Sequence, residues 1–152
     1  MNIKLSAIFL FIALSAVSCK DDPNAGAEEL MKEIRSDYEA GRDSACLIAI
    51  DTLRAKYPKA IEARKEALVI HQNATLRIAQ KDLESTDKQL EAAKARYAEL
   101  ERQVAKHKAE LCATPAELTA LTMQRILRDS LQTRFEVLCG QIRFIHKKQN
   151  AN

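Results

Sequence analysis

The chain has 152 residues, of which 30% are charged and only 5% aromatic, with three glycines, three prolines and no tryptophan. This composition is poor in the residues that build sheets and large globular cores, and it favours long helices and an all-α fold. The formal net charge of +3 comes from interspersed charges of both signs, without a basic face interleaved with aromatic residues, which argues against a nucleic-acid binder.

Residues 1–18 are predicted to be a secretory signal peptide. Lys4 supplies the positive end, and an apolar run of about 13 residues follows, shorter than the ~20 residues of a membrane-spanning helix. The run ends in the letters AVSC, which place Cys19 directly after small residues. This pattern resembles the lipobox of bacterial lipoproteins, in which the cysteine becomes the lipidated first residue of the mature protein. Ordinary cleavage after Ser18 is the alternative.

The lipobox resemblance implies that Cys19 carries fatty-acid chains such as palmitate, and several chains anchor a protein stably without a spanning helix. The letters KDD follow the cysteine and resemble the surface-export signal of some Gram-negative outer-membrane lipoproteins. The resemblance therefore implies a lipid-anchored protein of the outer membrane, facing either the periplasm or the cell surface. Residues 19–26 contain a proline, an asparagine and a glycine, so they are predicted to be the lipidated tether.

Two short helices are predicted next, over about residues 27–40 and 45–56. Gly41 suits the position just beyond the first helix, and Pro58 suits the end of the second. The segment resembles one tetratricopeptide-type helical hairpin, similar to repeats of outer-membrane assembly lipoproteins. Small residues in this segment let two helices approach closely, and a Tyr-Pro pair closes the unit. The residues that carry the resemblance are Tyr38, Glu39, Ala40, Gly41, Ala45, Ala49, Tyr57 and Pro58.

The tetratricopeptide-like region is predicted to cover residues 27–75. Only one copy of the hairpin occurs, and a single unit cannot bury a continuous core by itself. We therefore expect the following helix to complete the core through Ile61, Leu68 and Ile70.

From Lys59 to about Ala113 the pattern predicts one helix, about 80 Å long at 1.5 Å per residue, with residues 72–75 as the candidate place for a bend. Apolar or aromatic residues recur at every seventh position: Leu76, Leu83, Leu90, Tyr97, Val104 and Leu111. The positions three residues further on are mostly small: Ala79, Thr86, Ala93, Leu100 and His107. Such an uneven seam favours packing against an unlike helix over a parallel dimer of this helix.

The unlike helix follows directly in the sequence. Thr114-Pro115-Ala116-Glu117 is a capping box with proline at the first helical position, and it predicts a helix to at least Leu138. Gly140 is the candidate end or kink of this helix. Its apolar positions are Leu118, Leu121, Ile126, Leu127, Leu131, Phe135, Leu138, Ile142 and Ile145. Because the connection is short, residues 76–148 are predicted to form an antiparallel coiled-coil hairpin.

Little in the sequence points to chemistry. Cys46, Cys112 and Cys139 remain besides the predicted lipidation site, and a hairpin that turns at Thr114 separates the last two, so buried free thiols are expected rather than an internal disulfide. No histidine or cysteine pair has the spacing of a metal site, and no phosphate-binding loop or nucleophile elbow occurs. We therefore expect no metal, no cofactor and no catalytic residue.

In three places in the chain, an aspartate is followed by a serine or threonine and then by an apolar residue. These triplets resemble the acceptor motif for O-glycosylation in some Gram-negative exported proteins. The resemblance implies candidate acceptors at Ser44, Thr52 and Ser130. The alternative is that Asp43 caps a helix and that the other triplets are ordinary helix surface.

Together these patterns predict a non-catalytic lipoprotein of the cell envelope that acts as a protein-interaction or scaffold module. The expected partners are the membrane, through the lipid anchor, and an unidentified envelope protein, with homo-oligomerisation left open. The helical hairpin and the turn at Thr114 are the expected docking surfaces. The alternative function is a small helical carrier of a hydrophobic ligand, held in a cavity among four apolar residues: Leu30, Ile34, Ile50 and Leu68.

Overall fold

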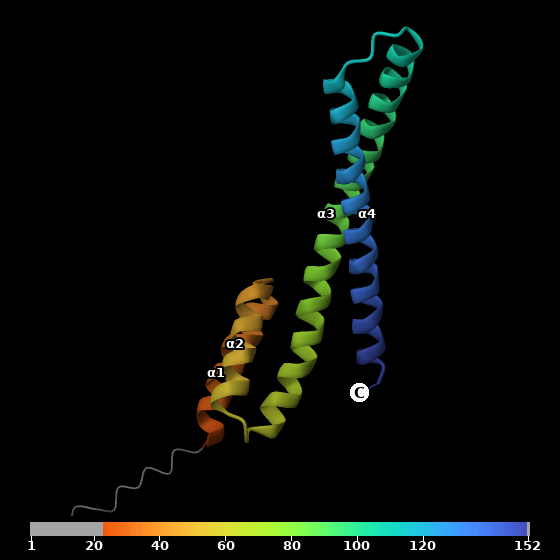
Figure 1. The fold of residues 1–152 in the computed structure, drawn as a ribbon. Helices are drawn as coiled ribbons and strands as arrows, with labels where there is room; N and C mark the ends of the chain where they lie inside the picture. Colours follow the sequence, from red (N-terminus) through yellow and green to blue (C-terminus); the bar gives the residue numbers. More distant parts are fainter. Residues whose placement is uncertain (1–22, 152) are drawn as a thin grey trace, which may run out of the picture.

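The computed structural model describes residues 23–151, which form four α-helices and no strand. The helices are α1 (Pro23–Glu39), α2 (Asp43–Lys56), α3 (Ile61–Ala109) and α4 (Pro115–Gln149). α1 and α2 pack beside the first part of α3, and α4 returns along the remainder of α3 on its other side (Figure 1). The result is an elongated rod with a three-helix base, which confirms the predicted all-α class, with its short hairpin and its long antiparallel helix pair. The predicted signal peptide and Cys19 lie outside the described residues.

The core of the base is closed by small residues of α3. Met31 and Ile34 of α1 and Ile50 and Leu53 of α2 are fully buried. The residues that face them from α3 and the loop before it are alanines: Ala60, Ala63 and Ala67. Alanines at these positions let the backbone of α3 approach both helices of the hairpin closely, which gives dense packing without large side chains.

The prediction that Ile61 and Leu68 complete this core is wrong, because both side chains are exposed; Ile70 is half-buried and packs at the edge of the core. Ala63, Ala67 and Ala74 lie on one face of the helix, spaced by four and seven residues, and that face is turned toward the hairpin. The small side chains therefore determine which face of α3 packs against α1 and α2, and the larger side chains of Ile61 and Leu68 remain exposed to solvent.

The turn between α1 and α2 is a Schellman motif. Gly41 has φ +72°, its N–H donates to the carbonyl of Tyr38 at 3.1 Å, and the N–H of Arg42 donates to the carbonyl of Asp37 at 2.9 Å. Glycine adopts this left-handed conformation without steric cost, which confirms the predicted role of Gly41.

The first helix begins earlier than the sequence predicted. α1 starts at Pro23, so residues 23–26, which were assigned to the tether, are helical. A proline in the first turn suits a helix start, because its missing N–H would have no partner there in any case. Gly26 lies directly against the ring of Tyr57, which leaves no room for a Cβ atom at that position.

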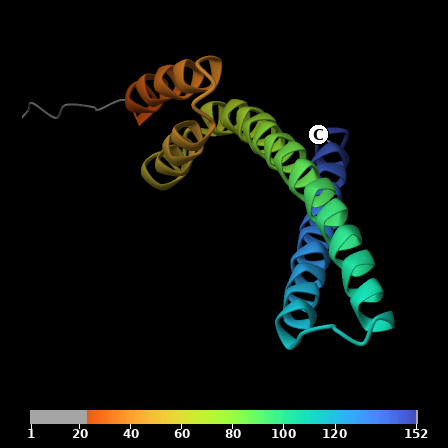
Figure 2. The ribbon, with the colours of Figure 1, turned by 90° about the horizontal axis from the view of Figure 1, so that it is seen from above.

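α3 is one continuous helix that spans both parts of the molecule, and it curves along its length (Figure 2). The segment proposed as a bend, residues 72–75, lies inside this helix without interruption. The predicted seam is confirmed, because Ala79, Leu90, Ala93 and Val104 are buried together with Thr86. The helix ends at Ala109, earlier than the predicted end near Ala113, so Leu111 lies in the turn and not in the seam.

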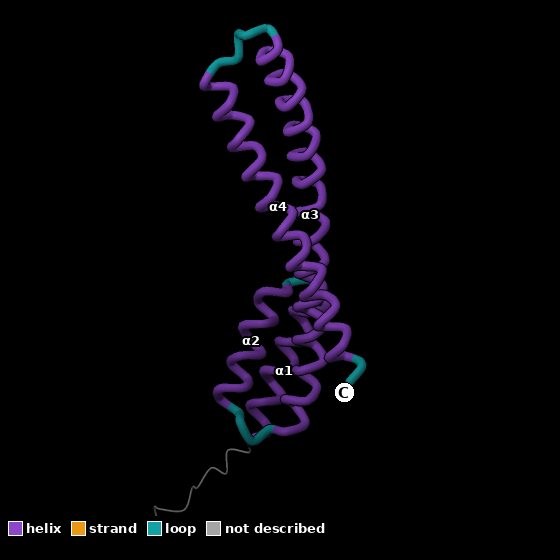
Figure 3. Tube along the Cα trace, turned by 45° about the vertical axis from the view of Figure 1, so that its right-hand side comes forward, coloured by secondary structure: helices purple, strands orange, loops and turns teal. Residues whose placement is uncertain are grey.

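α4 starts with the predicted capping box. The hydroxyl oxygen of Thr114 accepts a hydrogen bond from the N–H of Glu117 at 3.3 Å, and the Glu117 carboxylate accepts one from the N–H of Thr114 at 2.8 Å. Gly140 lies inside the helix, which continues to Gln149, so the expectation that it ends or kinks α4 is not met. Near the base, Gln149 donates to the side chain of Asn73 at 2.9 Å, and the loop that joins α3 to α4 lies at the far end (Figure 3).

Candidate interaction surface

α4 uses only part of its apolar residues to pack against α3. The inward residues alternate in steps of three and four, which is the spacing of a coiled-coil seam. They are Leu121, Gln124, Arg128, Leu131, Phe135, Leu138, Ile142 and Ile145. The two polar members are satisfied, because Gln124 donates to the carbonyl of Ala93 at 3.2 Å. The Arg128 guanidinium donates to Asp129 at 2.8 and 2.6 Å and also lies 4.2 Å from the centre of the Tyr97 ring.

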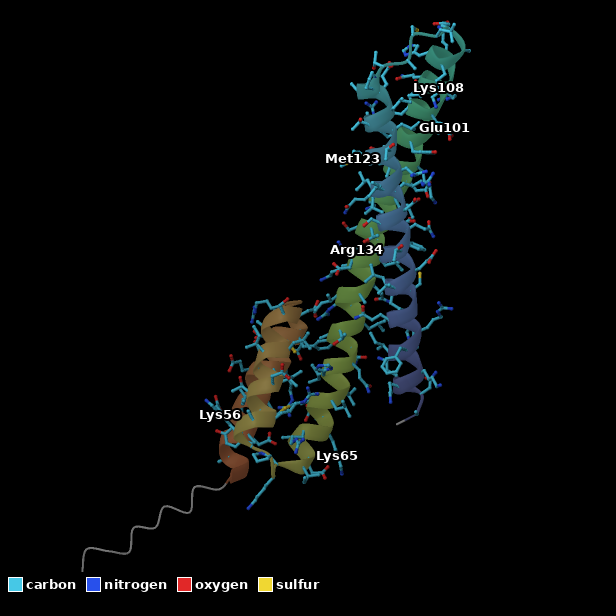
Figure 4. All side chains as sticks on the ribbon, viewed as in Figure 1. Lys56, Lys65, Glu101, Lys108, Met123 and Arg134 are labelled. Carbon is cyan, nitrogen blue, oxygen red and sulfur yellow. The ribbon has the colours of Figure 1, made fainter. Side chains whose placement is uncertain are left out.

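A second row of residues runs along the outside of α4 with the same alternating spacing. We call it the outer stripe; its members are Ala116, Thr119, Met123, Ile126, Ser130, Thr133, Val137, Gly140 and Phe144. The four large side chains are between 54% and 63% exposed, and Met123 projects from α4 in Figure 4. None of the nine residues is charged. An exposed row of this length that contains no charge and four large apolar side chains, on a helix whose opposite face already packs against α3, is typical of an interaction surface.

Gly140 in the outer stripe has no packing reason within the described chain. A Cβ atom added at this position would meet nothing within 4 Å. Glycine in a helix interior is about 1 kcal/mol less favourable than alanine. Within one chain, Gly140 therefore lowers the stability of α4, and no contact compensates for this loss.

The most elaborate polar site joins the α1–α2 turn to α3. Asp43 is buried, and the guanidinium of Arg77 donates to both of its carboxylate oxygens while Lys81 lies 3.3 Å away. Arg77 also donates to the carbonyl of Tyr38 at 2.8 Å and stacks over its ring at 4.5 Å. Burial raises the pKa of Asp43, but the hydrogen bonds from Arg77 and Lys81 outweigh burial and hold the pKa below its ordinary value.

This polar site is a structural tie rather than a reactive centre. Both oxygens of Asp43 are engaged, and within residues 23–151 no buried side-chain polar atom whose surroundings are described lacks a partner. The neighbouring Cys46 is fully buried, and burial, followed by the charges of Asp37 and Asp43, raises the pKa of its thiol. A protonated, inaccessible thiol is a poor nucleophile.

The tip of the rod carries an exposed leucine in a strained conformation. Leu111 has φ +56° and is 95% exposed. Its N–H donates to the carbonyl of Lys108 at 3.1 Å, and the N–H of Cys112 donates to the carbonyl of His107 at 2.8 Å. This is a second Schellman motif, with leucine at the position where glycine is preferred.

The tip is closed by contacts between α3 and the start of α4. His107 Nδ1 lies 2.6 Å from the Glu117 carboxylate. The N–H of Thr114 lowers the pKa of Glu117, followed by the hydroxyl of Thr114 and by His107. The turn around Thr114, predicted as a docking surface, therefore presents a fixed backbone and one free apolar side chain.

The three candidate O-glycosylation sites lie on three separate surfaces. Ser44 is exposed in the first turn of α2, Thr52 is half-buried and donates to the carbonyl of Ile48 at 2.9 Å, and Ser130 is exposed on the outer stripe. The three remaining cysteines are free thiols, but the expectation that they are buried holds only for Cys46, because Cys139 is half-buried and Cys112 is exposed.

The four residues named for a ligand cavity do not line a common groove. Ile34 and Ile50 have no exposed surface. Leu30 lines an open groove between α1 and α2, whereas Leu68 lines a different one beside Ile61. Tyr38, Leu47 and Tyr57 are partly buried against the core of the base.

Between residues 23 and 151 we find no cluster of three or more histidine, cysteine or acidic side chains able to hold a metal ion. None of the four described helices combines the length and the apolar character needed to cross a membrane.

The outer stripe is the feature that the sequence reasoning missed. Leu118, Ile126 and Leu127 were counted with the inward apolar positions of α4, and all three are exposed. The signal that could have revealed the stripe is a second row with alternating steps of three and four, displaced around the helix from the first row. Comparisons with known protein families, with curated proteins and with solved structures find no match to this chain.

Proposed function

We propose that this chain is a non-catalytic interaction module of the cell envelope that docks a partner α-helix along the outer stripe of α4. The observation that carries the proposal is the uncharged row from Ala116 to Phe144, whose large members are more than half exposed. Alternating steps of three and four match the holes between side chains of a facing helix. A flat or globular partner would not require this spacing over the length of α4.

The proposal includes a lipid anchor at Cys19. Only three residues separate this cysteine from Pro23, the first residue of α1, so the start of α1 would lie within about 15 Å of the anchored residue at ~3.5 Å per residue. α3 has 49 residues, which is about 74 Å at 1.5 Å per residue. An anchored chain would therefore keep its three-helix base near the membrane and carry its tip well away from it.

The exposed surface also favours docking over the alternative of a hydrophobic carrier. A carrier needs an enclosed apolar cavity, and the grooves beside Leu30 and Leu68 are open and are bordered by charged residues, among them Lys32, Glu33, Arg64 and Lys65. The outer stripe of α4, in contrast, is an exposed row without charged residues and is not enclosed.

Site-specific crosslinking in the native envelope tests the docking proposal. A photoreactive amino acid in place of Met123 is expected to give a crosslinked product whose partner peptide, identified by mass spectrometry, comes from a helix. The control is the same photoreactive residue at Ile48, which is 69% exposed on α2 and lies away from the stripe. Equal crosslinking at both positions, or none at Met123, would contradict the proposal.

The anchor is tested separately. Cys19→Ala is expected to release the protein from the membrane fraction, and mass spectrometry of the unaltered protein is expected to show acyl chains on Cys19. An unmodified thiol at this position would refute the anchor and would leave the docking surface to be judged by its own test.

A further inference from the structure

We infer that the helix that occupies the outer stripe is α4 of a second copy of this chain, packed parallel and in register. This inference rests on the proposed function, in which the stripe docks a helix, and it names the partner.

The stripe is complementary to itself in a parallel pairing. In a parallel coiled coil, each seam residue faces the same residue of the other chain. Four layers would then be apolar, formed by Met123, Ile126, Val137 and Phe144. The layers between them carry small residues, among them Ser130 and Gly140, so the two helices can approach closely.

The charges beside the stripe favour the parallel arrangement. Asp129 and Arg134 lie on opposite sides of the stripe and are five residues apart, which is the separation of residues that pair across a parallel coiled coil. Asp129 of each copy would therefore face Arg134 of the other, giving two attractive pairs. Arg143 and Lys148 have the same separation, so two like-charged pairs fall near the end of α4.

A fully overlapped antiparallel pairing is less favourable. It would place Met123 opposite Gly140 of the second copy, and Asp129 beside Glu136 of the second copy. By symmetry this contact between two carboxylates would occur twice. Like charges across a coiled-coil seam select against that pairing.

The parallel dimer also accounts for Gly140. Apart from the neighbouring residues and the nearby backbone of α4 itself, nothing lies within 4 Å of a Cβ atom at this position, so packing within one chain does not require glycine. A facing helix that approaches closely does require a small residue there, because its backbone occupies the space that a larger side chain would fill.

The buried area predicts a weak dimer. The stripe from Ala116 to Phe144 is about 43 Å long and a helix is about 10 Å wide, so each copy would bury on the order of 400 Å². A standard stable interface buries about 800 Å² per partner. The dimer is therefore expected to dissociate on dilution, and confinement of both copies to one membrane would raise their local concentration.

Charge exchange tests the inference on the full chain purified in mild detergent. Sedimentation at rising protein concentration is expected to show a monomer–dimer equilibrium. Asp129→Arg and Arg134→Asp are each expected to weaken the dimer at least tenfold, because each creates two like-charged contacts, and the double variant is expected to restore it. Ile48→Glu, on the far side of the base, is expected to leave the equilibrium unchanged, and circular dichroism verifies that every variant is helical.

A thiol crosslink tests the orientation. In a chain with Cys112→Ser and Cys139→Ser, Met123→Cys is expected to crosslink to itself with a short bismaleimide. In the antiparallel pairing the two introduced thiols would be about 25 Å apart at 1.5 Å per residue, and no crosslink would form.

The outcomes separate this inference from the proposed function. A purified chain that remains monomeric at every concentration, or a double charge variant no better than the single ones, overturns the homodimer. If photoreactive Met123 then captures a helix of another protein in the envelope, the docking function stands and only the identity of the partner changes. A crosslink to a second copy of this chain supports both.

Discussion

Replacing Leu111 by glycine is expected to stabilise the protein, although it removes a large apolar side chain. Leu111 occupies the left-handed position of the Schellman motif at the end of α3, with φ +56°. Its side chain is 95% exposed, so its loss removes almost no packing. The substitution therefore isolates the backbone strain at the tip of the rod.

The magnitude follows from two opposing terms. A non-glycine residue in the left-handed conformation costs about 1–2 kcal/mol. Glycine has the greater conformational freedom in the unfolded chain, which costs about 0.4–1 kcal/mol on folding. The net expectation for Leu111→Gly is a gain of about 0.5–1 kcal/mol in the free energy of unfolding, or roughly 2 °C in the midpoint of thermal unfolding.

The matched control is the other Schellman motif of the same chain. Gly41 has φ +72°, and a Cβ atom at this position would meet nothing within 4 Å, so Gly41→Ala introduces strain without a clash. We expect it to lower the free energy of unfolding by about 0.5–1 kcal/mol, from the same two terms with the opposite sign. Both variants are measured by urea unfolding followed by circular dichroism. If Leu111→Gly lowers stability while Gly41→Ala behaves as expected, the leucine side chain makes a stabilising contact and the strain argument is refuted.

Four further outcomes are expected. Arg77→Met leaves Asp43 buried with Lys81 as its remaining cation, and it should lower the free energy of unfolding in urea by about 2–4 kcal/mol; a loss below 0.5 kcal/mol would mean that the tie is dispensable. The pKa of Asp43 is lowered in the folded state, so the ionised carboxylate stabilises the fold above pH ~4, and this contribution is lost as the pH falls through the folded pKa. The unaltered chain should therefore lose more stability on acidification than Arg77→Met. Thr114→Ala removes the cap of α4 and should cost about 0.5–2 kcal/mol in the same assay. Ala67→Leu overfills the alanine face against α1 and α2 and should cost about 1–3 kcal/mol; thermal unfolding that is unchanged would indicate a looser base than the structure shows.

The parts of the fold that the sequence predicted well are those that local patterns determine. The heptad of α3 as far as Val104, the capping box at Thr114 and the glycine at position 41 each depend on residues close together in the chain, and all three are present. Two exposed ion pairs at helical spacing, Glu84–Lys88 and Glu99–Arg102, are equally local and lie at 2.6 and 2.5 Å. In each case one helix or one turn contains both the pattern and the structure that the pattern predicts.

The parts that were missed depend on which face of a helix meets a neighbour. Ile61 and Leu68 are larger and more apolar than the alanines of α3. The hairpin nevertheless packs only against the face of α3 that carries Ala63 and Ala67. Gly140 does not end α4, because Ile142 and Ile145 beyond it pack against α3 and outweigh the low helix propensity of one glycine.

The candidate site was the hardest part to predict. Two rows with the same spacing run along α4, and the sequence marks both as apolar without showing which one α3 covers. The polar residues Gln124 and Arg128 lie in the covered row, where hydrogen bonds satisfy them. Hydrophobicity alone therefore assigned Ile126 and Leu127 to the wrong face.

The continuity of α3 has a mechanical consequence. One helix of 49 residues forms a wall of the base and also one half of the rod, and its packing onto the short hairpin is reinforced by the bidentate contact of Arg35 on α1 with Glu66 on α3, at 2.6 and 2.8 Å. Since no hinge separates the two regions, a sideways load at the far loop acts as a torque on the alanine contacts of α3. The molecule therefore behaves as a lever, so that a displacement of the far loop is transmitted to the three-helix base.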